Sequence, residues 1–199
     1  MARAAANRVE VGTRISPRDL ITVEGGRVPV PDPGTVVHLQ LRRFAGCPVC
    51  NLHLRSIVGR HDEIEQAGVR EVVVFHSSVD DLRPHVADLP FAVIADPDKE
   101  LYVELGVEAS PRALLDPRAW PTILRAVAVS TWQIVRGRGR APSLNPAGGR
   151  YGLPADLLIG PDGTVAAVKY GTHAADQWSV DELLARAALV ADARPIQRR

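Results

Sequence analysis

Hydrophobic residues fall into short runs along the chain, and these runs predict strands and helices in alternation. Residues 20–30, LITVEGGRVPV, predict two short strands joined at 24–27, where two glycines supply the positive φ of a tight turn. The apolar runs at 36–41, 72–75 and 91–95 predict buried strands. The segments ADLLIG and TVAAVKY flank Pro161-Asp162-Gly163 and predict a β-hairpin near the end of the chain. The pattern therefore predicts an α/β fold.

The segments between these strands show helical spacing and helix start signals. A helix is expected from Pro48 onward, with a C-cap at Gly68. Ser78 with Asp81, and Ser179 with Glu182, have the spacing of capping boxes, so helices are expected to begin at these serines. A further helix is expected after Asp96-Pro97. The first helix places these apolar residues on one side: Leu54, Ile57, Val58 and Ile64.

Residues 111–150 interrupt this alternation and predict a helical insertion. Six apolar or small residues at helical spacing are expected to dock against the domain: Ile123, Leu124, Val127, Thr131, Ile134 and Val135. The opposite side carries Arg125, Val129, Trp132 and Arg136. That side is either solvated, or it forms a partner surface, a dimer contact or a membrane-interface anchor.

Length and composition limit the number of domains and the classes of function. With 199 residues, 46% of them hydrophobic, the chain can form one substantial core. We expect one domain over 11–192, with flexible ends at 1–10 and 193–199. The net charge of +1 gives no field for nucleic acid. Neither a signal-peptide apolar region nor eighteen consecutive apolar residues occur, so a cytoplasmic protein without a transmembrane segment is expected.

The two cysteines of the chain stand in one motif, Cys47-Pro48-Val49-Cys50, between a predicted strand and a predicted helix. At the helix N-cap, free backbone N–H groups and the helix dipole favour a thiolate, so Cys47 is the expected nucleophile. Pro48 suits the first helical position, and Cys50 lies one turn further on, within disulfide reach. In a reducing compartment this spacing indicates a catalytic or metal-binding pair. The redox hypothesis requires that the pair be reachable from solvent.

The predicted topology brings other polar residues to the same edge of the sheet, because parallel strands present functional loops at their carboxyl ends. His76 and His173 follow strands that end there, and either imidazole is able to transfer a proton or to have a purely structural role. Arg42 and Arg43 should point to opposite faces of the sheet. One of the two, assigned here to Arg43, is a candidate for stabilising a thiolate; the alternative is that both are surface cations.

A metal site is the alternative use of the motif, because Cys47, Cys50 and His53 have C-x2-C-x2-H spacing and His61 follows. On one helix, positions 47 and 53 are about 240° apart, since each residue turns the helix by about 100°. His53 should therefore point away from Cys47, and structural zinc is disfavoured. A non-enzymatic interaction protein is the other alternative.

The order of elements resembles the thioredoxin fold, and specifically the peroxiredoxin-like branch of the AhpC/TSA superfamily. Five segments carry the resemblance: LQLRRFAGCPVC, VVVFHSS, FAVIADPDKELYVELGV, LPADLLIGPDGTV and KYGTHAADQWSVDEL. It implies a central mixed sheet flanked by helices, with the N-terminal hairpin and the insertion as additions. It also implies a thiol peroxidase or disulfide oxidoreductase without a cofactor or metal. Pro154 occupies the position of the cis-proline that faces the motif in thioredoxin-like proteins.

The resemblance also defines the expected reaction and one departure from the family. Cys47 would attack a peroxide or a protein disulfide, and Cys50 would then form the 47–50 disulfide. A thioredoxin-like protein, glutathione or another low-molecular-weight thiol would restore the pair, and a homodimer is left open. Peroxiredoxins carry the pattern PxxxTxxC, but Gln40 and Phe44 stand at its proline and threonine positions. Arg112 lies loosely where the family carries an arginine near the thiolate.

Overall fold

Five strands form a mixed sheet in the order β5-β4-β3-β6-β7. The computed structural model describes residues 7–137, 141, 146 and 148–192. β3 pairs in parallel with β4 and antiparallel with β6, so the closing hairpin runs antiparallel to the first strand of the sheet. The strands of this sheet are β3 (Val36–Leu41), β4 (Val69–Phe75), β5 (Ala92–Ala95), β6 (Ala155–Ile159) and β7 (Val165–Tyr170).

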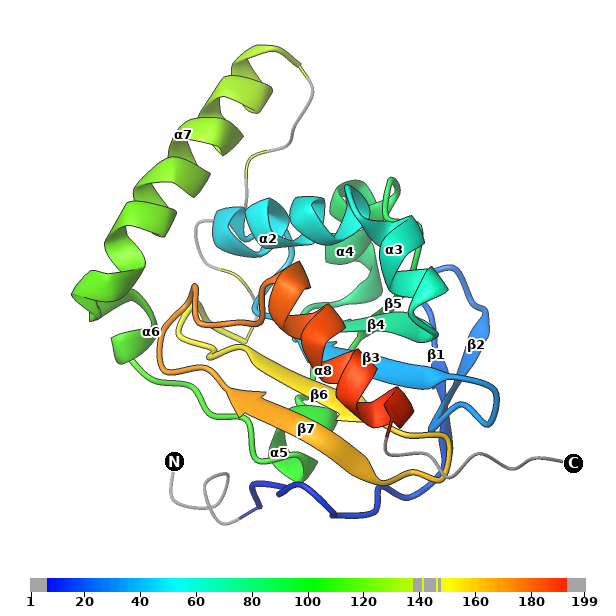
Figure 1. The fold of residues 1–199 in the computed structure, drawn as a ribbon. Coiled ribbons are helices and arrows are strands. Elements are labelled where there is room, and N and C mark those ends of the chain that lie inside the picture. Colours follow the sequence, from blue (N-terminus) through cyan, green and yellow to red (C-terminus); the bar gives the residue numbers. More distant parts are fainter. Residues whose placement is uncertain (1–6, 138–140, 142–145, 147, 193–199) are drawn as a thin grey trace, which may run out of the picture.

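A separate two-stranded sheet and the helices surround the mixed sheet (Figure 1). The two-stranded sheet is the predicted N-terminal hairpin, formed by β1 (Arg18–Ile21) and β2 (Arg27–Val30). The helices are α2 (Pro48–Val58), α3 (His61–Gln66), α4 (Val79–Val86), α5 (Glu100–Glu104), α6 (Arg112–Leu115), the 3-10 helix η1 (Pro117–Ala119), α7 (Trp120–Val135) and α8 (Val180–Asp192). The predicted fold class, with its hairpin and its helical insertion, is confirmed.

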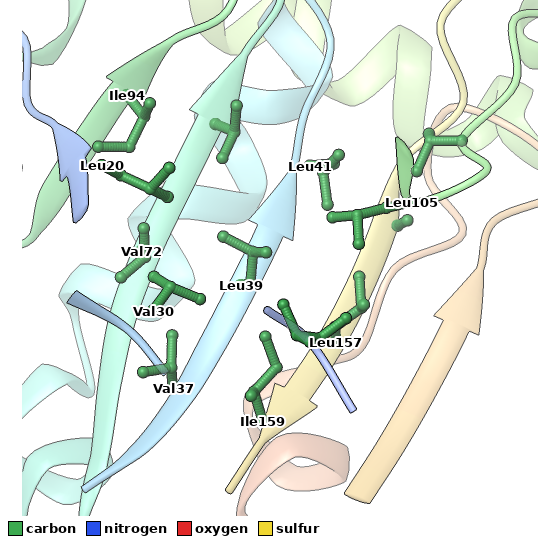
Figure 2. Packing of buried hydrophobic residues seen from close by; sticks show 14 of the residues in the cluster. Leu20, Val30, Val37, Leu39, Leu41, Val72, Ile94, Leu105, Leu157 and Ile159 are labelled. Carbon is green, nitrogen blue, oxygen red and sulfur yellow. The ribbon is translucent and has the colours of Figure 1, made fainter. Parts of the chain in front are cut away.

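Side chains of β3 alternate between the two faces of the sheet, as the pleat of a strand requires. Val37, Leu39 and Leu41 point to one face, where they pack with residues of β1, β2, β4 and β6 (Figure 2). The other face is covered by α2, α3, α4 and α8. The two cysteines belong to the apolar cluster of that second face, together with Leu54, Phe75 and Leu82. The redox motif therefore lies against the packed core.

Local start and stop signals account for most helix boundaries. The hydroxyl of Ser78 accepts the Asp81 backbone N–H, and Ser179 and Glu182 exchange backbone-to-side-chain hydrogen bonds, so both predicted caps are confirmed. The single helix predicted from Pro48 to the Gly68 cap is wrong. It is divided into α2, which ends at Val58 with Gly59 as its C-cap, and α3, which begins at His61. The Arg60 backbone N–H bonds to the Ile57 carbonyl, three residues back, so the helical bonding pattern is interrupted there.

The insertion forms the predicted helix α7, but the helix docks through a different face from the one expected. Leu124, Val127, Thr131, Ile134 and Val135 are exposed, so the expected docking face is wrong. The face toward α2 has smaller and more polar residues: Ala119, Thr122, Ile123, Ala126, Val129, Ser130 and Gln133 are buried or half-buried. Small side chains allow a close approach to α2, and periodicity alone could not distinguish two apolar faces.

The ends of the chain are only partly described. Most of the predicted flexible ends, 1–6 and 193–199, lie outside the described residues. Within 7–10, the Val9 backbone N–H donates to the Tyr170 hydroxyl at 2.9 Å, so this stretch contacts the domain. No helix within the described ranges is both long and apolar enough to cross a membrane.

Candidate active site

Cys47 is the N-cap of α2, and the strand-to-helix turn that holds it is tightly bonded. Pro48 occupies the first turn, as predicted, and the Cys47 sulfur accepts the Cys50 backbone N–H at 3.5 Å. Gly46 has a φ of +73°, which favours glycine, and the Ala45 N–H donates to the Ser77 hydroxyl at 2.9 Å. These bonds tie the turn to the end of β4. The first cysteine therefore faces the positive end of the helix dipole.

The two thiols are free and have opposite electrostatic environments. Burial opposes ionisation of Cys47, but the hydrogen bond from the Cys50 thiol, the Arg43 charge and nearby backbone N–H groups outweigh it. Together they lower the Cys47 pKa from 9.0 to about 6. Burial, and then the neighbouring Cys47 sulfur, raises the pKa of Cys50 well above 9.0. At neutral pH the pair consists of a thiolate at Cys47 and a thiol at Cys50.

Arg43 is the cation of this site. Its Nη1 donates to the Cys47 sulfur at 3.6 Å, and its Nη2 donates to the backbone carbonyl of Arg150. The guanidinium also lies over the ring of Phe44, 5.3 Å from the ring centroid. Arg42 and Arg43 are both buried, so the alternative of two surface cations is wrong. The described geometry agrees with the predicted place of Arg43 beside the thiol.

His76 lies next to this arginine, at the end of β4. Its backbone N–H donates to the Arg43 carbonyl, and its buried ring makes an edge contact with Tyr102 at 5.6 Å between centroids. Gly152 packs against the other side, where an added Cβ would lie 2.8 Å from the imidazole Nε2 and 3.8 Å from the Arg43 Cγ. The structure thus places His76 close to Arg43, as the topology argument predicted.

His173 and Pro154 have different surroundings from those expected. The His173 Nδ1 accepts the Ala175 backbone N–H at 3.2 Å, a contact within its own loop. The cis peptide bond in the described part of the chain is Val30–Pro31, so the expected cis bond at Leu153–Pro154 is wrong. The Leu153 N–H donates to the Glu108 carbonyl, and the Pro154 carbonyl accepts the Gly171 N–H. Extended backbone pairing on both sides of the bond accounts for the trans form.

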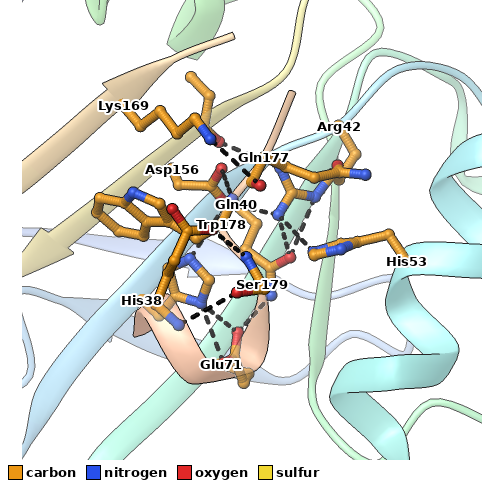
Figure 3. Close-up of polar contacts among 12 residues, drawn as sticks. His38, Gln40, Arg42, His53, Glu71, Asp156, Lys169, Gln177, Trp178 and Ser179 are labelled. Atoms are coloured by element: carbon orange, nitrogen blue, oxygen red, sulfur yellow. Dashed lines mark hydrogen bonds and ion pairs between the residues drawn. The ribbon is translucent and has the colours of Figure 1, made fainter. Parts of the chain in front are cut away.

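A buried polar network lies behind the redox turn, on the face of the sheet that α2 and α8 cover (Figure 3). Protonated His38 donates to Glu71 at 2.9 Å and to Asp156 at 3.2 Å. Arg42 donates to the same Asp156 at 2.6 Å and to the His53 Nε2 at 3.2 Å. Two cations and two carboxylates balance, as buried charges require.

The pKa values in the network follow from these contacts. Burial alone would lower the pKa of His38, but Glu71 and Asp156 outweigh it and raise that pKa to about 9. Burial, followed by the Arg42 charge, lowers the pKa of His53 to about 3, so this imidazole is neutral. His53 is thus a member of the network, not a partner of the cysteines. Sequence reasoning missed the network, although polar residues at 38, 40 and 42 alternate within an apolar strand.

Comparison with known proteins identifies the family. A family model described as "AhpC/TSA antioxidant enzyme" matches residues 56–173, which is more than half of the chain. The chain belongs to the AhpC/TSA family. Membership makes this AhpC/TSA protein an antioxidant enzyme of the thiol peroxidase and oxidoreductase class. The matched region begins after both cysteines, so the roles of Cys47 and Cys50 depend on their geometry. No curated protein is similar enough in sequence to match.

Solved structures support the same fold for this AhpC/TSA protein. Peroxidoxin BcpB from Mycobacterium tuberculosis is 12% identical, with a TM-score of 0.63, over 94% of this chain and 100% of that chain. A mutant peroxiredoxin 6 from Arenicola marina is 16% identical, with a TM-score of 0.66, over 96% and 80% of the two chains. A reduced 2-Cys peroxiredoxin from Plasmodium vivax is 14% identical, with a TM-score of 0.62, over 96% and 90%. At these identities the likeness concerns the fold.

Two features separate this AhpC/TSA protein from the expected peroxidatic pattern. Gln40 donates to Glu71 and accepts from Arg42, and Phe44 packs beside Arg43, so neither brings a hydroxyl to the sulfur. Cys47 and Cys50 are each only 1% exposed. The requirement of access from solvent is therefore not met in this conformation. Among the residues that the structure describes, no three His, Cys, Asp or Glu side chains are arranged to hold a metal ion.

Arg112, the other arginine considered, lies at the start of α6 and is exposed. No hydrogen bond or ion pair described for it involves either cysteine; its backbone N–H donates to the Ser110 hydroxyl. Of the two arginines that were candidates for the thiolate, only Arg43 contacts the Cys47 sulfur within the described part of the chain.

Proposed function

We propose that Cys47 is the nucleophile of a thiol-dependent reductase and that Cys50 is its resolving thiol. One observation carries this assignment: the Cys47 sulfur is the N-cap of α2 and lies 3.6 Å from the Arg43 guanidinium. The Cys50 hydrogen bond, the Arg43 charge and the backbone N–H groups outweigh burial and together lower the Cys47 pKa to about 6. The high pKa of Cys50 suits the second role, because a thiol that keeps its proton does not compete as the first nucleophile. We keep His76 as a supporting residue, because its ring and Arg43 both pack against Gly152. Supporting roles for His173 and Pro154 remain predictions, since their described hydrogen bonds lie within their own loop and strand.

The reaction with a peroxide balances without a cofactor. The Cys47 thiolate attacks one peroxide oxygen, the O–O bond breaks, and the leaving oxygen takes a proton to give water or an alcohol. Cys47 becomes a sulfenic acid. The Cys50 thiol then attacks this sulfur, water leaves, and the 47–50 disulfide forms. A low-molecular-weight thiol, or a thioredoxin-like protein after the redox turn has opened, reduces the disulfide. We place this cycle in a reducing compartment, the cytoplasm.

Burial of the sulfurs favours a small peroxide over a protein disulfide as the substrate. A protein disulfide must bring its own backbone to the sulfur, whereas a small peroxide needs only a local opening. A cavity of about 370 Å³ lies beside the site, lined in part by His76, Tyr102 and Gly152. Gly152 also packs against Arg43, the residue that contacts the Cys47 sulfur. A movement of this glycine and its neighbours would open a short route from the cavity to the thiolate.

Single-turnover oxidation tests the proposal. Wild-type protein treated with one equivalent of hydrogen peroxide or an organic peroxide should lose two thiols and form the 47–50 disulfide, read by mass spectrometry of peptides. Cys50→Ser should stop at a sulfenic acid on Cys47 that a cyclic diketone traps. Cys47→Ser should consume no peroxide. Peroxide consumption by Cys47→Ser at the wild-type rate would contradict the assignment of the nucleophile.

Disulfide exchange is tested in parallel, because it shares the first species. Reduction of insulin by the reduced protein should be slow if the buried pair serves a small peroxide. Fast insulin reduction that needs both cysteines, with no peroxide consumption, would show that a protein disulfide is the substrate. Bound zinc in stoichiometric amount in the purified protein would replace the redox assignment with a metal-binding one.

A further inference from the structure

Helix α7 exposes an apolar stripe along the side that does not touch the domain. The stripe consists of Trp120, Leu124, Val127, Thr131 and Ile134, all of which are exposed, and Leu124 is 70% exposed. Figure 1 shows α7 at the edge of the molecule, with its far end projecting beyond α2. Soluble proteins rarely leave a continuous apolar row of this length uncovered. The stripe therefore indicates a surface that is covered in the working protein.

The spacing of the stripe is that of a helix-pairing seam. Its residues follow one another at intervals of four, three, four and three, the repeat of a and d positions in paired helices. In an antiparallel pair about one twofold axis, Leu124 of one copy lies opposite Val127 of the other. The same axis places the large Trp120 opposite the smaller Thr131. The stripe is thus complementary to itself, as an isologous dimer interface requires.

Charge favours a second copy over other partners. Uncharged residues stand beside the stripe on both sides: Pro121, Ala128 and Val135 on one, Ile123 and Ser130 on the other. The arginines of α7 lie elsewhere; Arg125 is exposed on the side away from the stripe, and Arg136 stacks on the Trp132 ring at 3.8 Å. A helix that binds an anionic membrane surface places basic residues along its polar face beside the apolar one. A neutral seam offers no charged group that a charged partner could bind. A second copy can pack against it without burying any charge, so the dimer has no charge-desolvation cost.

The area of the stripe fits a dimer of modest size. Weighted by exposed fractions, the apolar residues of the stripe and the adjacent Val135, which is 80% exposed, present on the order of 500 Å², within the range of the largest patch that soluble monomers expose. Two such faces together would bury on the order of 1,000 Å², the threshold for a specific interface. We propose that this protein forms a homodimer through antiparallel packing of its two α7 helices.

The proposed interface lies one helix away from the redox turn. The opposite side of α7 contributes Ala126 to the apolar cluster that contains Cys47 and Cys50. A helix is about 10 Å across, so the dimer would hold α7 against α2 from outside. The dimer does not depend on thiol chemistry, and its test measures mass instead of turnover.

Sedimentation across a concentration series tests the proposal with a matched control. The wild-type protein should sediment as a dimer, and Leu124→Glu should sediment as a monomer with an unchanged circular dichroism spectrum, because Leu124 touches solvent instead of core. Leu189→Glu is the control, since Leu189 is 69% exposed and lies on α8. It should remain a dimer. A monomeric wild type, or a Leu124→Glu dimer, would overturn the proposal, as would a monomer that binds phosphatidylcholine–phosphatidylglycerol vesicles through the stripe.

Cross-linking tests the antiparallel arrangement. Leu124→Cys chains are mixed with Val127→Cys chains, both in a Cys47→Ser/Cys50→Ser background, and are oxidised. The mixed dimer should be the main product, because these two positions face each other only in the antiparallel pair. Cross-links only between identical chains would mean a parallel pair and would overturn this arrangement. A Leu189→Cys chain in the same background should remain uncross-linked.

Discussion

Replacement of Arg43 tests the electrostatic basis of the site. Arg43 carries the buried cation that contacts the Cys47 sulfur at 3.6 Å, within a site that excludes most water. Arg43→Gln keeps a hydrogen-bond donor of similar shape and removes the charge. The N-cap position and the Cys50 contacts stay in place. The change therefore isolates the share of the lowered pKa that comes from the guanidinium.

The size of the effect follows from the pKa of about 6. An opposite charge at this distance lowers a pKa by about 1–3 units, so its removal should raise the Cys47 pKa to about 8. At pH 7 the thiolate fraction would fall from about nine-tenths to about one-tenth, but the more basic thiolate is several-fold more nucleophilic, so the two alkylation rates should be about equal there. At pH 5–6 the alkylation of the variant should be roughly five- to tenfold slower. Above pH 9 both proteins are thiolates, and the more basic thiolate of the variant should react several-fold faster. The two rate profiles should therefore cross.

The assay is the rate of iodoacetamide modification of Cys47 against pH, followed by mass spectrometry. Both proteins carry Cys50→Ser, so that one thiol reacts and a hydroxyl donor remains at position 50. Burial of the sulfur slows both proteins equally and cancels in the ratio. Arg43→Lys is the matched control, because it keeps a cation and should retain a low pKa.

Two results would refute the reasoning. If the profiles for Arg43→Gln and its parent share one midpoint, the N-cap and the donor at position 50 lower the Cys47 pKa without help from the charge. A shift of the same size in Arg43→Lys would mean that packing of Arg43 against Phe44, not its charge, is responsible. Equilibrium unfolding of each variant shows whether the site is still folded at the pH values used.

The buried network gives two further predictions, both measured by urea unfolding. In a Cys47→Ser background, the free energy of unfolding should fall by up to about 3 kcal/mol as the pH rises from 6.5 to 9. The His38 pKa is raised to about 9, so its contribution is complete below its unfolded value and is lost above about 9. The Cys47→Ser background is needed because the low Cys47 pKa makes the native protein more stable as the pH rises over the same range. If the pH dependence of the unfolding free energy is unchanged in His38→Gln, the assignment of this slope to His38 is wrong. Asp156→Asn should cost about 3–5 kcal/mol, because it leaves Arg42 and His38 buried without their shared carboxylate; a loss below about 1 kcal/mol would contradict it.

Much of the fold follows from local signals that act over a few residues. The hairpin, the five strands and the serine caps could be predicted because short apolar runs bounded by turn residues, and capping boxes, are local signals. The break at Gly59 and the docking face of α7 could not. Both depend on which neighbour the helix meets, and α7 is apolar on more than one side. Helical periodicity identifies the faces of a helix, but it does not say which one is covered.

The reactive cysteines of the site could be predicted from the sequence, but the positions of the surrounding residues were predicted less well. The N-cap place of Cys47 follows from a strand, a proline and a helix in sequence order, all of them local. The position of Pro154 came from a resemblance instead, and its bond is trans because pairing with residues far away in the sequence determines the backbone there. His173 lies in a loop whose own hydrogen bonds determine its place. Neither is visible in local sequence.

The two adjacent arginines show what the alternation of side chains along a strand can and cannot predict. Alternation correctly sends Arg42 and Arg43 to different surroundings, but it does not say which one meets the sulfur. The contacting residues determine this. Asp156, from a strand more than a hundred residues later, forms an ion pair with Arg42 in the buried network, and Arg43 contacts the Cys47 sulfur at the redox turn. A neutral Asp156 side chain would remove the charge that holds Arg42 in place. The structural carboxylate is therefore a condition for the chemical role of the neighbouring arginine.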